Sequence, residues 1–474
     1  MLIIQLTGKM KNNKIELIPS LKTNNILLDE AKDNEICKQM ENIINVKNAT
    51  KLFYLSHHFK STKMSNISLL FIERFFQMVV ESKTFLELDY IHVGKIISSD
   101  ELNVDSELQI INVVEDWLSH KRTERSKYAK DLLLKIRLSL LSDPALNYIL
   151  EKKPSFNTNA ECVGIIKHVL ENKKDSHSSK TSVTSRYCKQ DKFNIIICGG
   201  ENNKKALIHF NDVYSVNDDN FCNVNNLPPM LTRRSDFKAV CIKGEVYIFG
   251  GSGSNHNYIR SIEKYSPANN SWENVADIFD DGVRFCAVSF MGNVYFMGGL
   301  LNGPTYSCIK FDTINLTWTE ISRMNETRCR AACAVFEGRV VVSGGINCVY
   351  GSLNTVEAYD HVADSWSHMP NMIESRDYHK SVAVKNKLFV VGGSITRTSE
   401  VYDSSCHKFV LLKPPPVCFT HYPAEIISIG SKLTVFNHTG RILFYDIEKN
   451  EWTVKRCDLT KGLQRYSCVK LPQL

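Results

Sequence analysis

Five times after residue 190, a hydrophobic run ends in two adjacent glycines. The pairs are Gly199-Gly200, Gly250-Gly251, Gly298-Gly299, Gly344-Gly345 and Gly392-Gly393. Their first members are 51, 48, 46 and 48 residues apart. A strand-length run that recurs with this period predicts a β-propeller, in which each blade packs on its neighbours because it is too small to be stable alone.

A second landmark stays in register with the first, since two aromatic residues seven positions apart follow each run. The pairs are Tyr214/Phe221, Tyr265/Trp272, Phe311/Trp318, Tyr359/Trp366, Tyr402/Phe409 and Tyr445/Trp452. They indicate six units, the last with Asn437-His438-Thr439-Gly440 where the glycine pair would stand. We expect these side chains to fill the wedge between neighbouring blades.

The double glycine is compatible with a phosphate-binding loop or with a backbone turn. Phosphate loops have spacings such as G-x-x-x-x-G-K-[ST] or G-x-G-x-x-G and lead into a helix. Here each pair leads into a polar loop and then a strand. We therefore expect a sharp turn beside a central channel, where glycine tolerates positive φ and close backbone approach.

The two ends of the repeat region complement each other. The first unit begins with the strand that ends at Gly200, without the Arg-bearing strand that precedes the other units. After Trp452 one more alternating strand follows, and no glycine-pair strand comes after it. We expect residues 465–471 to complete blade one and close a six-bladed all-β propeller over residues 191–474, which removes open sheet edges.

The first half has the periodicity of helices. Apolar residues recur at spacings of three and four over 67–82, where Ser65 or Asn66 is placed to cap the start. Ser106 and Gln109 form a capping-box pattern. One apolar face then follows, made of Ile110, Val113, Val114, Trp117 and Leu118, and a second helix carries Leu132, Leu133, Ile136 and Leu140.

These patterns predict an α-helical domain over residues 37–171. Residues 1–36 are assigned to an N-terminal tail. The Ser-, Thr- and Lys-rich stretch 172–190 has almost nothing to bury and is assigned to a linker.

In combination, the motifs resemble the kelch-like family. The glycine pair, the Tyr-x6-Trp spacing and the preceding arginine resemble kelch repeats. The helical half resembles the BACK domain, most clearly in ISSDELNVDSE (97–107) and KIRLSLLS (135–142). The resemblance implies an insect-type or viral-type member whose BTB domain is truncated or missing, since the 36 residues ahead of the helical domain hold at most a BTB remnant.

The resemblance also implies a function. Kelch-like proteins are substrate adaptors of cullin-3 RING ubiquitin ligases, in which the propeller binds the target protein and the BTB domain dimerises and docks cullin-3. Some members bind actin instead. A cytoskeletal binder or ligase-independent scaffold is therefore the alternative, which a missing BTB domain favours. The expected location is the cytoplasm, with association to the cytoskeleton under the alternative.

A partner site is expected where the innermost strands begin, because these starts ring one mouth of the channel. Basic residues fall there sixteen or fourteen positions ahead of a glycine pair, just behind one of them, or through ring closure: Arg234, Arg328, Arg376, Arg284, Arg330, His379 and Arg465. The resemblance adds residues just after the glycine pairs: Glu201, Ser252, Ile346, Tyr350 and Ser394.

Together these residues predict a positive pocket for an acidic or phosphorylated peptide, bound through charge-assisted hydrogen bonds. The alternative for each arginine is a hydrogen bond to loop carbonyls inside the fold.

Other function classes find no support in the residues. H-E-x-x-H and G-x-S-x-G do not occur, and the 15 cysteines include no C-x-x-C pair, so we expect no enzyme, no cofactor and no metal. A net charge of +7 over 474 residues without a basic, aromatic-interleaved stripe does not favour nucleic acid. No apolar stretch approaches the roughly 18 residues of a membrane span.

Overall fold

The computed structural model describes residues 30–104, 106–174, 193–201, 211–217, 220–253, 257–278, 284–300, 303–384, 387–394, 396–404, 406–416, 425–429, 432–436, 441–456 and 465–472. Most of the expected tail and linker lie outside these residues, as does Asn437 of the sixth repeat. The chain divides into two compact units, one helical and one built of β-strands.

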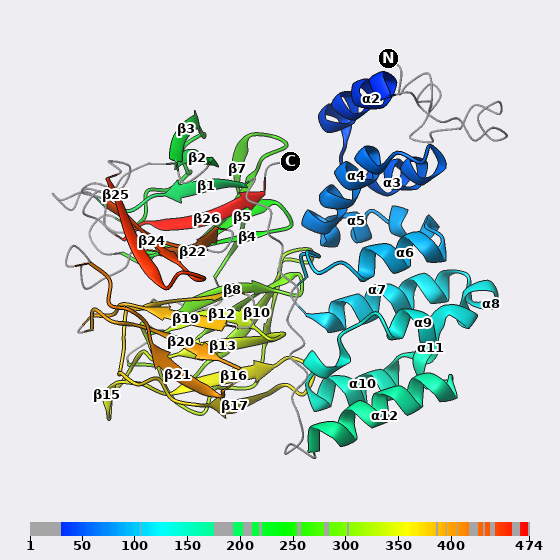
Figure 1. The fold of residues 1–474 in the computed structure, drawn as a ribbon. Helices are drawn as coiled ribbons and strands as arrows, with labels where there is room; N and C mark the ends of the chain where they lie inside the picture. The colour runs from blue at the N-terminus through cyan, green and yellow to red at the C-terminus, as the bar shows by residue number, and fades with distance from the viewer. Residues whose placement is uncertain are drawn as a thin grey trace. The chain divides into compact units, whose positions relative to one another are not determined.

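The helical unit is a succession of short helices (Figure 1). They are α2 (Glu30–Ile43), α3 (Ala49–His58), α4 (Thr62–Arg74), α5 (Phe76–Glu81), η2 (Thr84–Glu87), α6 (Tyr90–Ile97), α7 (Glu107–His120), α8 (Arg122–Arg125), η3 (Ser126–Tyr128), α9 (Ala129–Leu133), η4 (Leu138–Leu140), α10 (Asp143–Lys152), α11 (Pro154–Asn157) and α12 (Ala160–Lys174). None of the helices among the described residues is long and apolar enough to cross a membrane.

Helix α7 forms as its sequence predicts. The Ser106 side chain caps its start by accepting a hydrogen bond from the backbone N–H of Leu108 at 3.1 Å. All five residues of the expected apolar face are buried. Trp117 at the centre of this face also donates its indole N–H to the carbonyl of Leu88 at 2.8 Å, so the helix is held by packing and by a buried hydrogen bond.

The helix expected over 67–82 is wrong in its bounds. Helix α4 starts at Thr62, with Ser61 rather than Ser65 or Asn66 as its cap. It ends at Arg74, and α5 begins at Phe76 after the single residue Phe75. The apolar spacing continues across the break, so periodicity alone could not reveal it. The second expected helix also stops early, at Leu133, and Leu140 belongs to the separate 3-10 turn η4.

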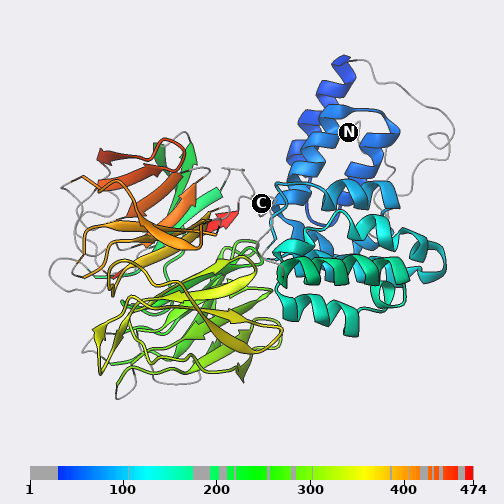
Figure 2. The ribbon, with the colours of Figure 1, turned by 60° about the horizontal axis from the view of Figure 1, so that its bottom comes forward.

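The β unit contains six four-stranded antiparallel sheets among the described residues (Figures 1 and 2). In order from the innermost strand, they are β26 (Ser467–Pro472), β1 (Phe193–Cys198), β2 (Asn211–Asn217), β3 (Asn220–Asn226); β4 (Lys238–Ile242), β5 (Glu245–Phe249), β6 (Ser261–Ser266), β7 (Ser271–Asp277); β8 (Cys286–Phe290), β9 (Asn293–Met297), β10 (Cys308–Asp312), β11 (Thr317–Glu320); β12 (Ala332–Phe336), β13 (Arg339–Ser343), β16 (Val356–Asp360), β17 (Ser365–Met369); β18 (Lys380–Val384), β19 (Lys387–Val391), β20 (Ser399–Asp403), β21 (Lys408–Leu411); and β22 (Glu425–Ile429), β23 (Lys432–Phe436), β24 (Arg441–Asp446), β25 (Glu451–Arg456). A small hairpin, β14 (Ile346–Asn347) and β15 (Gly351–Ser352), is separate from them.

The expected pairing of the two chain ends is confirmed. Strand β26 pairs antiparallel with β1, from Phe193 opposite Pro472 to Cys198 opposite Ser467. In Figure 1 the red β26 runs beside the green β1. The innermost strands contact one another in the order β26, β4, β8, β12, β18, β22 and again β26. A β-propeller therefore follows the helical region, and its last strand belongs to its first sheet.

The glycine pairs mark the turns at which adjacent sheets touch. At Gly344 and Gly345 the φ angles are +56° and +97°. The N–H of Gly345 donates to the carbonyl of Arg376 in the next sheet at 2.8 Å, and a Cβ at Gly345 would stand 2.7 Å from the carbonyl oxygen of Cys329. Both expected reasons for glycine, positive φ and close backbone approach, are confirmed here.

The aromatic pairs are cross-strand neighbours that also reach the preceding sheet. Tyr359 lies opposite Trp366, with ring centroids 5.2 Å apart. Trp366 donates its indole N–H to the carbonyl of Ser322 at 2.8 Å, and three further tryptophans, Trp272, Trp318 and Trp452, make the equivalent bond. The expected role between blades is therefore confirmed for these pairs.

The first unit is an exception to this pairing. A bulge between Val213 and Tyr214 shifts the register, so that Phe221 lies opposite Val216. The seven-residue spacing of Tyr214 and Phe221 therefore does not make them cross-strand partners, because a bulge adds a residue to one strand only.

Candidate functional site

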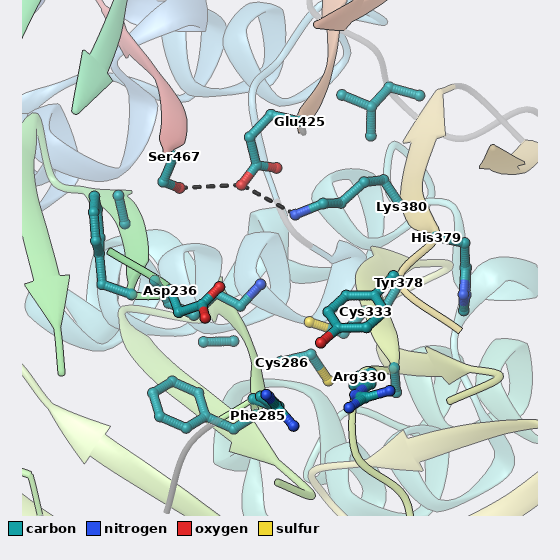
Figure 3. Close-up of a pocket in the computed structure, with 18 of the residues that line it drawn as sticks. Asp236, Phe285, Cys286, Arg330, Cys333, Tyr378, His379, Lys380, Glu425 and Ser467 are labelled. Atoms are coloured by element: carbon teal, nitrogen blue, oxygen red, sulfur yellow. Dashed lines mark hydrogen bonds and ion pairs between the residues drawn. The ribbon is translucent and has the colours of Figure 1, made fainter. Parts of the chain in front are cut away.

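A cavity of about 640 Å³ opens where the innermost strands begin (Figure 3). Each of the six sheets contributes a short segment to its wall: residues 236–239, 284–287, 330–333, 378–381, 425–426 and 465–468. These segments come from equivalent positions of the repeat. The sequence-based placement of a site at this mouth therefore coincides with a real hollow.

The first residue of five of these segments has a left-handed backbone. The residues are Asp236, Arg284, Arg330, Tyr378 and Arg465, with φ between +53° and +61°. Backbone hydrogen bonds link them across neighbouring sheets, from Arg330 N–H to the Arg284 carbonyl at 3.0 Å, from Tyr378 to Arg330 at 3.0 Å and from Asp236 to Arg465 at 3.3 Å. A non-glycine residue with positive φ is uncommon, and it persists only where the surrounding structure fixes the backbone. These five residues therefore form a rigid rim around the cavity.

Positive charge predominates in the cavity wall. Five cationic side chains, Lys238, Arg284, Arg330, Lys380 and Arg465, face two carboxylates, Asp236 and Glu425. Such an excess of one sign in a concave site raises the local concentration of ligands with the opposite charge.

Part of this charge is already paired. Lys380 lies 3.2 Å from Glu425, which also accepts a hydrogen bond from Ser467 at 3.1 Å (Figure 3). Burial lowers the pKa of Lys380, and the carboxylate of Glu425 partly offsets this. Arg465 lies 3.5 Å from Asp236.

Two other cations of the wall are unpaired among the described residues. Within this part of the chain, the side chains of Lys238 and Arg284 make no hydrogen bond or ion pair. Arg330 stacks over the ring of Tyr378, 4.7 Å from its centroid, and lies 3.9 Å from Asp377. These contacts orient the guanidinium but leave donors of Arg330 free for a ligand.

The expectation that Arg234, Arg328 and Arg376 face a partner is wrong. All three are buried, with at most 1% of their surface exposed. Arg328 is typical, because it pairs with Glu357 at 2.6 Å and donates to the carbonyls of Gly344 at 2.8 Å and Thr355 at 3.2 Å. The alternative, a hydrogen bond to loop carbonyls, is confirmed.

The glutamates of these ion pairs are residues that the sequence reasoning missed. Glu263 pairs with Arg234 and Glu400 with Arg376, as Glu357 does with Arg328. Each stands two positions before the tyrosine of its aromatic pair, which is the signal that could have identified them. The third repeat has Ile309 at the glutamate position and Gly282 at the arginine position, so both partners are replaced together.

His379 reaches the cavity but carries no charge there. Its side chain is buried, and Nε2 lies 2.8 Å from the hydroxyl of Ser343. Burial, with Arg376 nearby, lowers the pKa of His379 to about 3. The expectation that this histidine contributes positive charge is therefore wrong at neutral pH.

The residues after the glycine pairs do not line the cavity. Glu201 lies 3.4 Å from Arg465 of the cavity wall, and the Ser394 hydroxyl donates to Asp377, which precedes the rim residue Tyr378. Ser252 forms a β-bridge with Ser235. Ile346 is in the β14–β15 hairpin, and Tyr350 lies between its strands with 78% of its surface exposed.

Several residues of the cavity wall were not predicted from the sequence, notably Lys238, Lys380, Tyr378 and Glu425. They stand fourteen or twelve positions ahead of the glycine-pair position, as Arg284 and Arg330 do at fourteen. Side chains two apart on a strand share a face. A search at both offsets, for any polar residue rather than for arginine, would have found them.

Comparisons with known proteins agree with this architecture. Residues 49–151 match the family model BACK, described as BTB And C-terminal Kelch. Residues 180–393 match the model described as the KLHDC2/KLHL20/DRC7 Kelch-repeats domain. Fold and family models together define a protein with a BACK region followed by a kelch-repeat propeller.

Whole-chain relatives extend the match. The chain is 25% identical to Kelch-like protein 7 of Rattus norvegicus, over 91% of this chain and 76% of the relative. It is 22% identical to Kelch repeat and BTB domain-containing protein 3 of Homo sapiens, over 82% of this chain and 74% of the relative. The two family models and these relatives together support a kelch-like protein of the BTB-BACK-kelch type.

Proposed function

We propose that the chain is the substrate-recognition adaptor of a cullin-3 RING ubiquitin ligase, and that its propeller binds an acidic or phosphorylated segment of a target protein. The single observation that carries the proposal is the cavity wall, with five cations against two carboxylates. In this view the six sheets are six blades of one closed ring. The cyclic contacts of the innermost strands and the β1–β26 pairing support that view.

The rim is suited to selective capture. Arg284 and Arg330 are neighbours in the backbone hydrogen-bond chain, so their guanidinium groups project from a fixed frame. A guanidinium binds a carboxylate or phosphate through two parallel hydrogen bonds, which gives orientation as well as affinity. A volume of about 640 Å³ lies within the usual range of roughly 300–1,000 Å³ for ligand pockets.

A peptide array tests the recognition step. It carries acidic and phosphoserine peptides, each beside a counterpart with Gln for Glu and Ser for phosphoserine. We expect wild-type chain to prefer the charged member, and R284A/R330A to lose that preference. Removal of such a charge contact typically costs about 2–5 kcal/mol, which is about 30-fold or more in affinity. R323A is the matched control, because Arg323 is exposed and does not line the cavity.

Equal binding of charged and neutral peptides, or an unchanged preference in R284A/R330A, would contradict an acidic ligand. The adaptor role is tested separately by co-immunoprecipitation of cullin-3 with the full chain. Co-sedimentation with actin filaments without cullin-3 binding would instead support the cytoskeletal alternative.

A further inference from the structure

Two cysteines from neighbouring sheets meet in the wall of the cavity. Cys286 is the first residue of β8, Cys333 is the second of β12, and these innermost strands are in contact. Both cysteines line the cavity, with the Cys286 Sγ 3.5 Å from the carbonyl of Met297 and within reach of a hydrogen bond from the side chain of Cys333. Figure 3 shows them on the same side of the pocket as Arg330. Neither is in a disulfide.

The two thiols are not equivalent. The hydrogen bond from Cys333 lowers the pKa of Cys286 against the opposing effect of burial, and the charges of Lys238 and Arg328 lower it further. The same hydrogen bond, with burial, raises the pKa of Cys333 well above its ordinary value. Of the two thiols, Cys286 is therefore the one that loses its proton more readily, and Cys333 is the hydrogen-bond donor to it.

A third thiol nearby provides an internal comparison. Cys308 lies in the same sheet as Cys286, since both are opposite Met297. It does not line the cavity, its thiol points to the carbonyl of Tyr306, and burial raises its pKa. Thiolate character and access govern cysteine oxidation. Both thiols are buried and both point to a backbone carbonyl, so Cys286 differs from Cys308 in lining the cavity and in the direction of its pKa shift.

We propose that Cys286 and Cys333 form a reversible oxidation site, which a peroxide entering the cavity converts to a disulfide between two sheets. The Cys286 thiolate attacks one peroxide oxygen, the O–O bond breaks, and a sulfenic acid and hydroxide result. The Cys333 sulfur then attacks the sulfenic sulfur, and the S–O bond breaks as a second hydroxide leaves.

The sequence of steps balances. The protons of the two thiols convert the two hydroxides to water, so two thiols and one hydrogen peroxide yield one disulfide and two water molecules. A thiol reductant such as dithiothreitol reverses the change. The site does not depend on the proposed ligase role.

Trypsin separates the residues cleanly. Cleavage after Arg284 and Lys310 releases a peptide with Cys286 and Cys308, and cleavage after Arg330 and Arg339 releases one with Cys333 alone. The folded full chain is treated with hydrogen peroxide, its free thiols are alkylated, and the digest is analysed by mass spectrometry with and without dithiothreitol.

We expect a cross-linked pair of these peptides that lacks two hydrogens and disappears with dithiothreitol. Fragment ions should place the link on Cys286. The link should be lost in C286S and in C333S but retained in C308S. In C333S, which lacks the resolving thiol, Cys286 should accumulate sulfenic acid that a dimedone probe captures.

Absence of the cross-link in wild-type chain would overturn the proposal, and this result requires no variant to fold. A link through Cys308, or a link that survives in C333S, would overturn it as well. Thermal unfolding of each variant beforehand shows whether a lost link reflects chemistry or a lost fold.

Discussion

The buried ion pair of Arg328 and Glu357 gives the sharpest test of how the sheets are held. Both side chains have 0% of their surface exposed. Glu357 also accepts the backbone N–H groups of Asn325 at 2.7 Å and Glu326 at 3.2 Å, which belong to the segment entering β12, the innermost strand of the same sheet. The change E357Q keeps the shape of the side chain and removes the close counter-ion of the buried guanidinium, which then has only the partly exposed carboxylate of Glu326, 3.5 Å away.

The expected cost is large. Breaking a buried pair by removing one partner costs about 3–5 kcal/mol, because the remaining charge is uncompensated. At roughly 2.1 cal/mol/K per residue, a β unit of about 280 residues has an unfolding entropy near 0.6 kcal/mol/K. The Tm of the propeller should therefore fall by about 5 to 8 °C.

Differential scanning calorimetry resolves such a shift, and an exposed pair provides the control. Glu337 lies 3.8 Å from Arg339 in the same sheet, with both side chains partly exposed. E337Q should cost no more than about 1 kcal/mol. The double variant R328M/E357L should lie closer to wild type than E357Q, because an apolar pair leaves no charge behind.

A Tm for E357Q within about 1 °C of wild type would refute the reasoning, since about 3 kcal/mol should shift Tm by more than that. A double variant as unstable as the sum of its single changes would show that the two residues do not interact.

Two further predictions concern the turn glycine and the buried histidine. G345A should destabilise the chain more than G351A. Both changes add a side chain at positive φ, which costs about 1–2 kcal/mol, but only Gly345 faces a backbone oxygen at 2.7 Å, and this overpacking adds about 1–3 kcal/mol. Equal Tm values for the two variants would contradict the close approach at Gly345. The pKa of His379 is about 3 in the folded chain and near 6.5 in the unfolded chain, so its contribution to the free energy of unfolding is fully present above pH 6.5 and falls by about 1.4 kcal/mol per pH unit below it. The Tm of wild type should therefore fall more than that of H379Q between pH 7.5 and 5.5. Equal losses in Tm would show that His379 does not titrate as stated.

Much of the fold follows from local repetition. The sequence predicted the propeller and the β1–β26 pairing from the glycine pairs, the aromatic pairs and the complementary chain ends. These features recur because each repeat has the same tight turn and the same packing against its neighbour. The helix bounds around Phe75 and Leu133 could not be predicted, since the hydrophobic spacing passes through both breaks and only packing decides where a helix stops.

The sequence predicted a partner site where the innermost strands begin, and a cavity lies at that place. Arg284, Arg330 and Arg465 do line the cavity. Arg328 does not, although it stands only two residues before Arg330, because its side chain turns inward to Glu357. In one sequence a surface arginine and a buried one look alike, since the partner that distinguishes them is 29 residues away.

The amino-acid sequence by itself determined that this chain repeats a β unit, that the repeat closes on itself and that basic residues gather where the innermost strands begin. These properties depend on spacing, which sequence records directly. Only the tertiary structure decided which cations meet solvent, that His379 is neutral and that Cys286 and Cys333 share a hydrogen bond. Burial and charge pairing between sheets arise from residues distant along the chain, so they exist only once the sheets have assembled.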